Sequence, residues 1–359
     1  MKRKNIDVKI LPVNNSVPFT YNGRLAFALA ATLGEKNINE DVWNWIYSEF
    51  TQILCKKKIE PPIRHTFFHV YTPYNPFLKT KYSLRIKRLW VDPEKALDDV
   101  IAHISNDFFV NMRLDLQYIK AFEMQDGPKI HSEHIYGYDI NEEKLYLLRF
   151  DYQKGMYSMC ISFDEFKKAY TPMVGLNQKL INIYYKVNKE VSYKIKPKYV
   201  KKRLVNYVNN IFPIFDFLNT QIGQNLFAWD IPYGNAIGLS AMKYVKNVLQ
   251  TEYEDDNCFT RYGRYIESRT RLQAVYEFKK LMFDRLTYLS NNSYIPFNTT
   301  TQDLIKKYKN ICDNYLIIRN KYIKYQYTGQ KKYLEDIINE IEYLQYTEKN
   351  VLEELLHFV

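Results

Sequence analysis

The sequence predicts an α+β fold in which a mixed domain over residues 1–170 precedes an all-α domain over residues 171–359. Apolar residues recur at helical spacing up to about residue 104, and apolar and polar residues alternate between about residues 110 and 162. Helical spacing returns after residue 171 and continues to the end of the chain. A chain of 359 residues is long enough for two domains with separate hydrophobic cores.

Three helices are expected in the first part of the chain. Residues 22–33 are rich in alanine and leucine and apolar on most sides, which indicates a buried helix that ends at Gly34. Asn39 can cap a second helix, whose apolar residues keep helical spacing as far as Ile53. The dipeptide Asp92-Pro93 is typical of a helix start and predicts the third helix.

Four strands of one antiparallel sheet are expected where the pattern alternates. Between residues 110 and 114 apolar residues alternate with polar ones, as in a strand with one buried face. The helix over residues 22–33 should pack on this sheet, and Ser162 with Glu165 forms a capping box that begins a short helix. The predicted strands are Val110–Leu114, His134–Tyr138, Leu145–Phe150 and Met156–Ser162.

Beyond residue 171 the pattern predicts helices only, so we place a domain boundary near residue 170. The final helix is the clearest, because its leucines and isoleucines fall on one face. The helical patterns cover roughly residues 176–192, 198–219, 236–250, 265–289, 300–324 and 331–357.

The charge balance fits a nucleic acid, an acidic protein or a phosphate-bearing partner equally well. The chain has 51 Lys and Arg against 40 Asp and Glu, which gives a net charge of +11 and a pI near 9.1. The lysine clusters are explained most simply as solvent-facing helix surfaces, and next best as a surface for an acidic carrier protein. Nucleic-acid binding is unlikely, because no helix-turn-helix, RNA-recognition or zinc-finger pattern accompanies them. The clusters are Lys56–Lys58, Lys196–Arg203 and Lys306–Lys309.

Several classes of protein are excluded by the motifs that the sequence does not contain. No run reaches the ~18 apolar residues of a membrane helix, and the basic start is followed by no apolar stretch, so we expect a cytoplasmic protein that is not membrane-bound. The 4 cysteines form no CxxC pair, and the glycine-rich phosphate loops GxGxxG and GxxxxGK[ST] are absent. We therefore expect no metal and no bound cofactor.

One histidine and one aspartate form a candidate catalytic pair. His131 and His134 are a weak metal pattern, because a spacing of three in a strand places the two rings on opposite faces. His134 begins one predicted strand and Asp151 follows the end of the next, so a hairpin can bring them together. A histidine base oriented by a carboxylate is the arrangement that activates a cysteine or serine nucleophile.

These segments together resemble the butirosin-biosynthesis protein H (BtrH)-like family. The resemblance covers nearly the whole chain, and the order and spacing of its motifs are moderately specific. It rests on His131-x-x-His134-Ile135-Tyr136-Gly137-Tyr138-Asp139, Leu145–Asp151, Ser162–Phe166, Asp115, Gly238–Met242, Arg271–Phe278 and the closing helix Ile338–Leu355.

The resemblance implies a papain-like cysteine-protease fold followed by a helical domain, in a thiotemplated pathway such as nonribosomal-peptide biosynthesis. Such proteins move an acyl group from the phosphopantetheine thioester of an acyl or peptidyl carrier protein, or of a synthetase, to a small-molecule amine. By the same resemblance, His134 is the base, Asp151 orients it, and Asp115 lines the site, to which His131 also belongs.

The nucleophile is the point at which this sequence departs from the family. The family's cysteine lies about thirteen residues before the glycine that ends the first buried helix, and that position is Tyr21 here. A phenol with an ordinary pKa near 10 is a poor substitute for a thiol. Thr20 and Ser16 are alternative hydroxyl nucleophiles, and Asn22 is explained most simply as the helix cap.

Two functions therefore remain open, and a third is weaker. The first is a BtrH-like acyltransferase homologue that lacks the usual cysteine and uses a hydroxyl instead. The second is a non-catalytic scaffold, or pseudoenzyme, that binds a carrier protein. The third is nucleic-acid binding. The missing cysteine favours the scaffold, whereas His134 and Asp151 favour catalysis.

Overall fold

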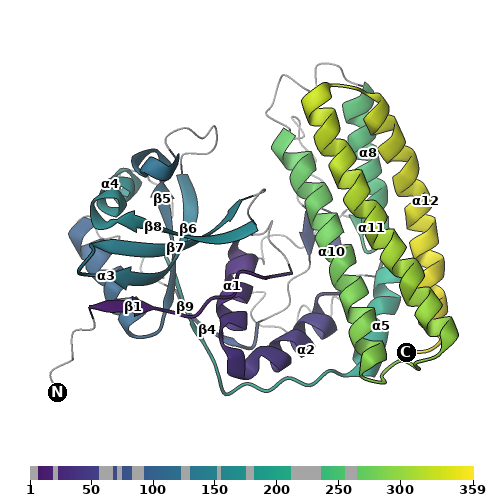
Figure 1. The fold of residues 1–359 in the computed structure, drawn as a ribbon, viewed down its shortest axis with the longest axis horizontal. Helices are drawn as coiled ribbons and strands as arrows, with labels where there is room; N and C mark the ends of the chain where they lie inside the picture. The colour runs from purple at the N-terminus through teal and green to yellow at the C-terminus, as the bar shows by residue number, and fades with distance from the viewer. Residues whose placement is uncertain are drawn as a thin grey trace. The chain divides into compact units, whose positions relative to one another are not determined.

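The chain forms two compact units in the computed structural model (Figure 1). Unit 1 comprises residues 1–42 and 76–192, and unit 2 comprises residues 43–75 and 193–359. The chain crosses between the units three times, within helix α2, between Asn75 and Pro76, and between Ser192 and Tyr193. The sequence suggested a single boundary near residue 170. The described residues are 7–18, 23–55, 68–70, 75–82, 93–122, 130–151, 155–174, 182–211, 236–254 and 265–359.

Unit 1 is built on an antiparallel sheet with strand order β4-β9-β5-β6-β7-β8. A short strand, β1, pairs with residues 137–139 of β6, beyond residues 130–135, which pair with β5. The four predicted strands all lie in this one sheet, which confirms that expectation. The bounds are β1 Val8–Ile10, β4 Leu78–Tyr82, β5 Phe109–Asp115, β6 Ile130–Asp139, β7 Lys144–Asp151, β8 Gly155–Ser162 and β9 Ile183–Val187.

Strand β9 corrects the helix predicted over residues 176–192. All of its residues except Lys186 are apolar or aromatic, and they are mostly buried because β9 lies between β4 and β5. A strand covered on both faces shows no period of two, so its pattern cannot be told from that of a buried helix. This pairing also explains why unit 1 extends beyond residue 170.

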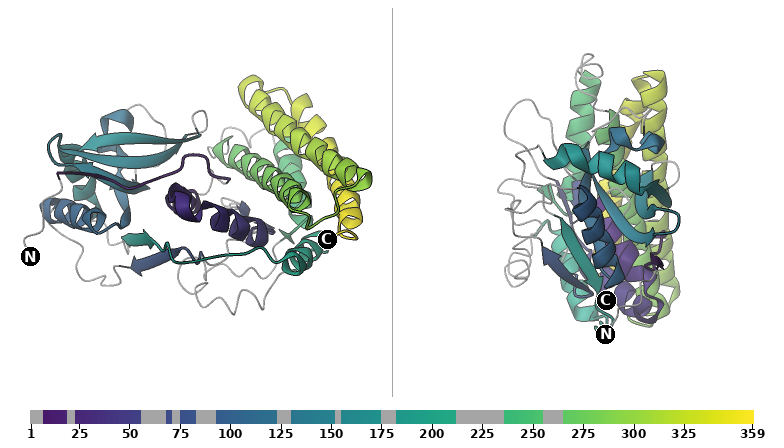
Figure 2. Two further views of the ribbon diagram at one scale, coloured as in Figure 1. Left: turned by 60° about the horizontal axis from the view of Figure 1, so that its bottom comes forward. Right: turned by 90° about the vertical axis from the view of Figure 1, so that its left-hand side faces the viewer.

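Helices cover the two faces of the sheet. Helices α3 and α4 pack against β5, and α1 lies on the other face (Figures 1 and 2). A capping box begins α4 as predicted, since the Glu165 carboxylate accepts from Ser162 N at 2.8 Å and Ser162 Oγ accepts from Glu165 N at 3.1 Å. The bounds are α1 Gly23–Gly34, α2 Asn39–Glu49, α3 Pro93–Ser105 and α4 Phe163–Val174, with short 3₁₀ turns at Lys36–Ile38, Leu116–Tyr118 and Lys120–Phe122.

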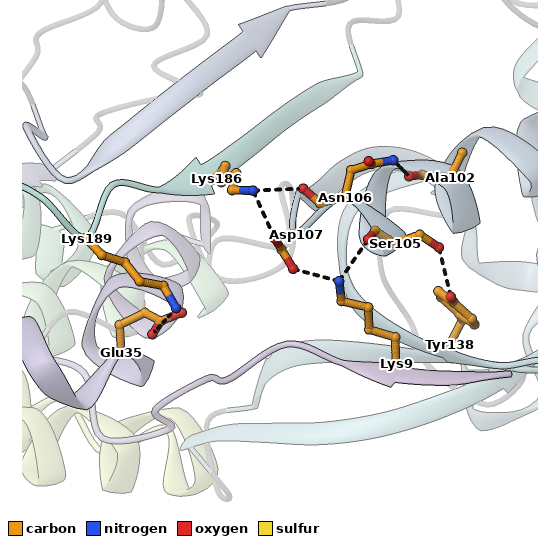
Figure 3. A network of polar contacts seen from close by, with 9 residues as sticks. All are labelled: Lys9, Glu35, Ala102, Ser105, Asn106, Asp107, Tyr138, Lys186 and Lys189. Carbon is orange, nitrogen blue, oxygen red and sulfur yellow. Dashed lines mark hydrogen bonds and ion pairs between the residues drawn. The ribbon is translucent and has the colours of Figure 1, made fainter. Parts of the chain in front are cut away.

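A lysine from each of two strands is tied to the end of α3 (Figure 3). Lys9 on β1 donates to Ser105 O at 2.9 Å and to Asp107 Oδ1 at 2.6 Å. Lys186 on β9 donates to Asn106 O at 3.1 Å and to Asp107 Oδ2 at 2.9 Å. Cations are favourable beside the free carbonyl groups of a helix C-terminus. These contacts therefore hold β1 and β9 to the helix layer.

Unit 2 is a helical bundle that also carries a three-stranded sheet, β10-β2-β3. The all-α domain expected over residues 171–359 is therefore wrong in this detail, because that range contributes strands β9 and β10, and β10 pairs with β2. Among the described residues, no helix has both the length and the apolar character needed to cross a membrane. The bounds are β2 Ile53–Cys55, β3 Phe68–Val70, β10 Ala236–Ile237, α5 Pro197–Val208, α8 Ser240–Glu254, α10 Tyr265–Asn291, α11 Thr299–Thr328 and α12 Lys332–Leu355.

A buried arginine attaches the segment after α2 to α10. Arg285 is fully buried, and its guanidinium donates to Tyr47 O and Phe50 O, each at 2.6 Å. Burial lowers the pKa of Arg285 to about 10. These two bonds satisfy the carbonyl groups where α2 ends, so residues 43–55 belong with the helices of unit 2.

Candidate active site

His134 is a buried histidine in the middle of the unit 1 sheet. It lies on β6, opposite Asn111 of β5 on one side and Leu148 of β7 on the other. The residue is only 4% exposed, because α1 covers this face of the sheet. Buried polar side chains need hydrogen-bond partners. The contacts of the imidazole ring therefore define the site.

Asn111 supplies a polar contact to this ring. Its Nδ2 atom lies 3.1 Å from His134 Nδ1 and 2.9 Å from His134 Nε2, and it also donates to Glu133 O at 3.2 Å. An amide N–H can donate only to a ring nitrogen that carries a lone pair. Which ring nitrogen of His134 carries a proton depends on the tautomer. A neutral imidazole is the form that accepts a proton as a general base.

Phe27 of α1 stacks on the His134 ring. The two ring planes are 13° apart, with centroids separated by 3.2 Å. Helix α1 begins at Gly23, four residues before Phe27, which corresponds to about 6 Å along a helix axis. The imidazole is thus about one turn from the N-terminus of a buried helix, where the helix dipole stabilises negative charge. A base beside such a helix start is an arrangement suited to activating a nucleophile.

Several predicted site residues are not brought to His134 by described contacts. Thr20, Tyr21 and Asn22 lie outside the described residues. Asp151 is the last residue of β7 and pairs with Gly155. It lies three positions after Leu148, the β7 residue that pairs with His134. The side chain of Asp151 is not among those that the structure describes. The orienting role of Asp151 therefore stays a prediction.

Asp115 has a local structural contact at the end of β5. One carboxylate oxygen accepts from Gln117 N at 3.2 Å and the other from Gln117 Nε2 at 2.9 Å. A short polar side chain that bonds the backbone two residues ahead stabilises a turn. This contact explains the buried aspartate as the cap of the turn Leu116–Tyr118.

His131 lies on the same strand as His134, and a spacing of three places its ring on the opposite face, as predicted. Its Nδ1 atom is 3.0 Å from Glu133 Oε1, and Arg149 Nη1 is 3.6 Å from the same oxygen. Glu133 is 1% exposed, so a charged carboxylate there needs these basic neighbours. The described residues contain no group of three or more metal-ligating side chains that could hold a metal ion.

The sequence pattern does not mark Asn111 or Phe27 as neighbours of His134. Asn111 alternates with valine and methionine, which predicts a solvent-facing position. Asn111 is only 3% exposed, because α1 covers the face of the sheet that the pattern predicted to face solvent. The burial of Asn111 could have been predicted, because the helix over residues 22–33 was expected to pack on the sheet and would cover one of its faces.

A second buried polar cluster lies within unit 2. The ammonium group of Lys279 on α10 and the carboxylate of Glu348 on α12 are 2.6 Å apart, and both side chains are 0% exposed. Lys279 also donates to the Tyr207 hydroxyl at 2.6 Å. The hydroxyls of Tyr207 and Tyr308 donate to Glu348 Oε1 at 3.1 and 2.6 Å. One carboxylate thus accepts from three donors on three helices, α5, α10 and α11.

Burial shifts the titration of this cluster. Desolvation lowers the pKa of Lys279 below its ordinary value, while the charge of Glu348 opposes that change. Desolvation also raises the pKa values of Tyr207, Tyr308 and Tyr315 well above 10.0. The three tyrosines therefore stay protonated, and Tyr207 and Tyr308 donate to Glu348. The cluster is explained as an internal ion pair that joins the helices.

The comparison with known proteins adds no relative. No protein-family model matches the chain, and no curated protein matches it.

Proposed function

We propose that the chain is a BtrH-like acyltransferase homologue, with a papain-like unit 1 that transfers an acyl group from a carrier-protein thioester to an amine. The observation that carries the proposal is the position of His134, a buried ring in contact with an amide N–H, about one turn from the start of α1. A base beside a helix N-terminus is what nucleophilic acyl transfer requires.

The reaction follows from these groups. A hydroxyl before α1, that of Thr20 or Ser16, attacks the thioester carbonyl while His134 takes its proton. The carbon–sulfur bond breaks, and the phosphopantetheine thiolate leaves with that proton. An amine then attacks the acyl-enzyme, and its proton passes through His134 to the departing nucleophile. The product is an amide, and the phosphopantetheine arm belongs to the substrate rather than to this chain.

The donor is an acidic acyl or peptidyl carrier protein, or a synthetase that bears one, and the acceptor is a small-molecule amine. The basic charge of the chain supports an acidic donor. We place the reaction in the cytoplasm.

Mass spectrometry of the protein after incubation with an acylated carrier protein tests this function. We expect an acyl group on a peptide that contains residues 16–22, and we expect His134→Gln to abolish it. An adduct that persists in His134→Gln, or that forms only on one of the four natural cysteines, would contradict the mechanism.

A second experiment restores the family's nucleophile. The Tyr21→Cys thiol should react with an acyl-pantetheine thioester faster than free cysteine at pH 7, because a helix N-terminus and an imidazole lower the pKa of a thiol. The double variant Tyr21→Cys/His134→Gln should lose this advantage. Reaction no faster than that of free cysteine would show that residue 21 is not the nucleophile position.

A non-catalytic carrier-binding scaffold is the second candidate. The 4% exposure of His134 and the stacking of Phe27 over its ring favour it, because both limit access to the base. Carrier binding without any acylation of the wild-type protein, together with a reactive Tyr21→Cys thiol, would establish this candidate in place of the first.

A further inference from the structure

Helix α5 begins with an unusual concentration of positive charge. Five of the nine residues from Lys194 to Lys202 are lysines, and they are exposed or half-buried. Lys198, Lys201 and Lys202 are three and four residues apart, so they lie on one face of the helix. We call these five residues the α5 lysine cluster; they are Lys194, Lys196, Lys198, Lys201 and Lys202.

The charge of this cluster is not neutralised within the parts of the chain that the structure describes. Among the described residues, no ion pair involves any of the five lysines, whereas Lys246, Lys309 and Lys321 of unit 2 pair with carboxylates. Lys306, Lys307 and Lys332 of unit 2 likewise have no ion pair among the described residues, but α11 and α12 do not gather five such lysines in nine positions. The neighbouring carboxylate, Glu49, is bound to Arg203 at 2.8 Å.

The cluster also opposes the stability of its own helix. The first turn of α5 contains no acidic residue, and its cap residue, Lys196, makes no side-chain capping bond. Cations near a helix N-terminus are unfavourable, and like charges three and four residues apart repel each other. A local arrangement that costs stability is expected where a surface serves a function.

The residues around the lysines distinguish an acidic protein from a nucleic acid. Single-stranded nucleic acids bind surfaces that offer exposed aromatic rings and arginines for stacking. Here Tyr199 donates its hydroxyl to Glu49 at 3.0 Å, and Arg203 lies over the Tyr199 ring at 4.8 Å. Arg203 is buried and covers one face of the half-buried Tyr199 ring, so the arginine is not available to stack on bases. The surface therefore offers mainly flexible point charges, which suit carboxylates on a protein.

We propose that the α5 lysine cluster is the docking surface for an acidic protein partner. The inference rests on the proposed function, in which the acyl donor is an acidic carrier protein, and it assigns the surface of this chain that binds that donor. Attraction between opposite charges accelerates such an association and is weakened by salt.

Binding of a phosphopantetheinylated acyl carrier protein at low salt tests the assignment. The variant Lys198→Glu/Lys201→Glu/Lys202→Glu should weaken binding at least tenfold. The matched variant Lys306→Glu/Lys307→Glu/Lys332→Glu changes the net charge equally on α11 and α12, at exposed lysines for which no ion pair is described, and should weaken binding less than twofold. Equal loss in both variants, or loss in neither, would overturn the proposal.

Thermal unfolding of the same two variants gives a second readout. Glutamates in the first turns of α5 complement the helix dipole, so the α5 variant should keep or raise the melting temperature while it loses binding. A lowered melting temperature would attribute the lost binding to damaged structure and overturn the assignment. Duplex DNA that binds more tightly than the carrier protein, and is lost in the α5 variant, would assign the surface to nucleic acid instead.

The two proposals fail separately. Carrier binding that depends on the α5 lysine cluster without acyl transfer would reject the catalytic function and keep the docking surface. Acyl transfer that does not depend on the cluster would keep the function and reject the surface.

Discussion

The two buried polar clusters, one in each unit, use opposite kinds of chemistry. The unit 1 cluster contacts His134 with an amide and an aromatic ring. The unit 2 cluster buries two full charges, Lys279 and Glu348, and surrounds them with hydroxyl groups. In a buried ion pair both groups stay charged, because neutralising either one leaves the other charge without compensation. The contacts named above for His134 come from an amide and an aromatic ring, neither of which carries a charge.

The largest effect is expected from breaking the ion pair of unit 2. Glu348→Gln keeps the size of the side chain but leaves Lys279 charged and buried, and it should lower the free energy of unfolding by about 3–5 kcal/mol. Urea unfolding measures this change. Glu353→Gln, at an exposed residue of the same helix that pairs with Lys349, is the control and should cost about 0.5 kcal/mol or less. Equal costs in both variants would mean that the buried charges are not compensating each other.

A strong dependence on alkaline pH should follow from the tyrosines of unit 2. Their pKa values are raised above 10.0, so above that pH the unfolded state has released protons that the folded state keeps, and stability falls as pH rises. The lowered pKa of Lys279 makes stability rise with pH, but this effect of one lysine is smaller than the combined effect of the three tyrosines. These four groups alone contribute a loss of about 2–3 kcal/mol per pH unit above pH 10. Tyr47 and Tyr199, whose pKa values burial raises to about 12, add to it.

Urea unfolding between pH 8 and pH 11 measures this slope, and the ultraviolet absorbance of tyrosinate reports the titration. Tyr315→Phe removes one of the three groups and should make the slope shallower. A stability that stays flat above pH 10 would contradict the burial of these hydroxyls.

A charge can also be introduced beside His134, which makes the unit 1 cluster resemble that of unit 2. Asn111→Asp places a carboxylate against the ring and should raise the pKa of His134 by about 1–3 units relative to the wild-type protein. Nuclear magnetic resonance of the His134 ring protons measures the titration. A protonated ring cannot act as a base, so any acyl transfer should lose activity at neutral pH. An unchanged His134 pKa would show that the Asn111 contact is not present in solution.

The smallest effect is expected at the exposed ion pairs of Asp107. The hydrogen bond from Lys9 is the main cause that lowers the pKa of this carboxyl below 3.8, so its contribution is present at neutral pH and is lost as pH falls through the lowered pKa. Asp107→Asn should cost about 0.5 kcal/mol, because the side chain is 55% exposed. Asparagine tolerates the left-handed backbone at this position, where φ is 66°, so thermal unfolding should report the charge alone.

Strong local patterns predicted most of the elements. The four strands between Val110 and Ser162, the capping box of α4 and the long helices α10, α11 and α12 lie close to their predicted bounds. In these segments the period of the apolar residues matches the face that is buried. The prediction failed at β9, where both faces are covered and the period disappears.

The candidate site was predicted less completely than the fold. The sequence singled out His134, because a histidine that leads into an apolar strand is conspicuous. It did not identify Asn111 or Phe27 as its neighbours, since these depend on the register between β5 and β6 and on the position of α1. Strand register is fixed by the packing of a whole face rather than by a single residue.

By itself, the sequence determined the α+β class, the pairing of strands close in the chain, the basic charge and the histidine of the candidate site. These properties follow from composition and from periodic patterns within a few residues. Only the tertiary structure decided that residues 43–75 join the C-terminal helices, that β9 completes the sheet, and that Lys279 meets Glu348. The physical reason is that each depends on contacts between segments far apart in the chain, where burial on a second face or a distant partner overrides the local pattern.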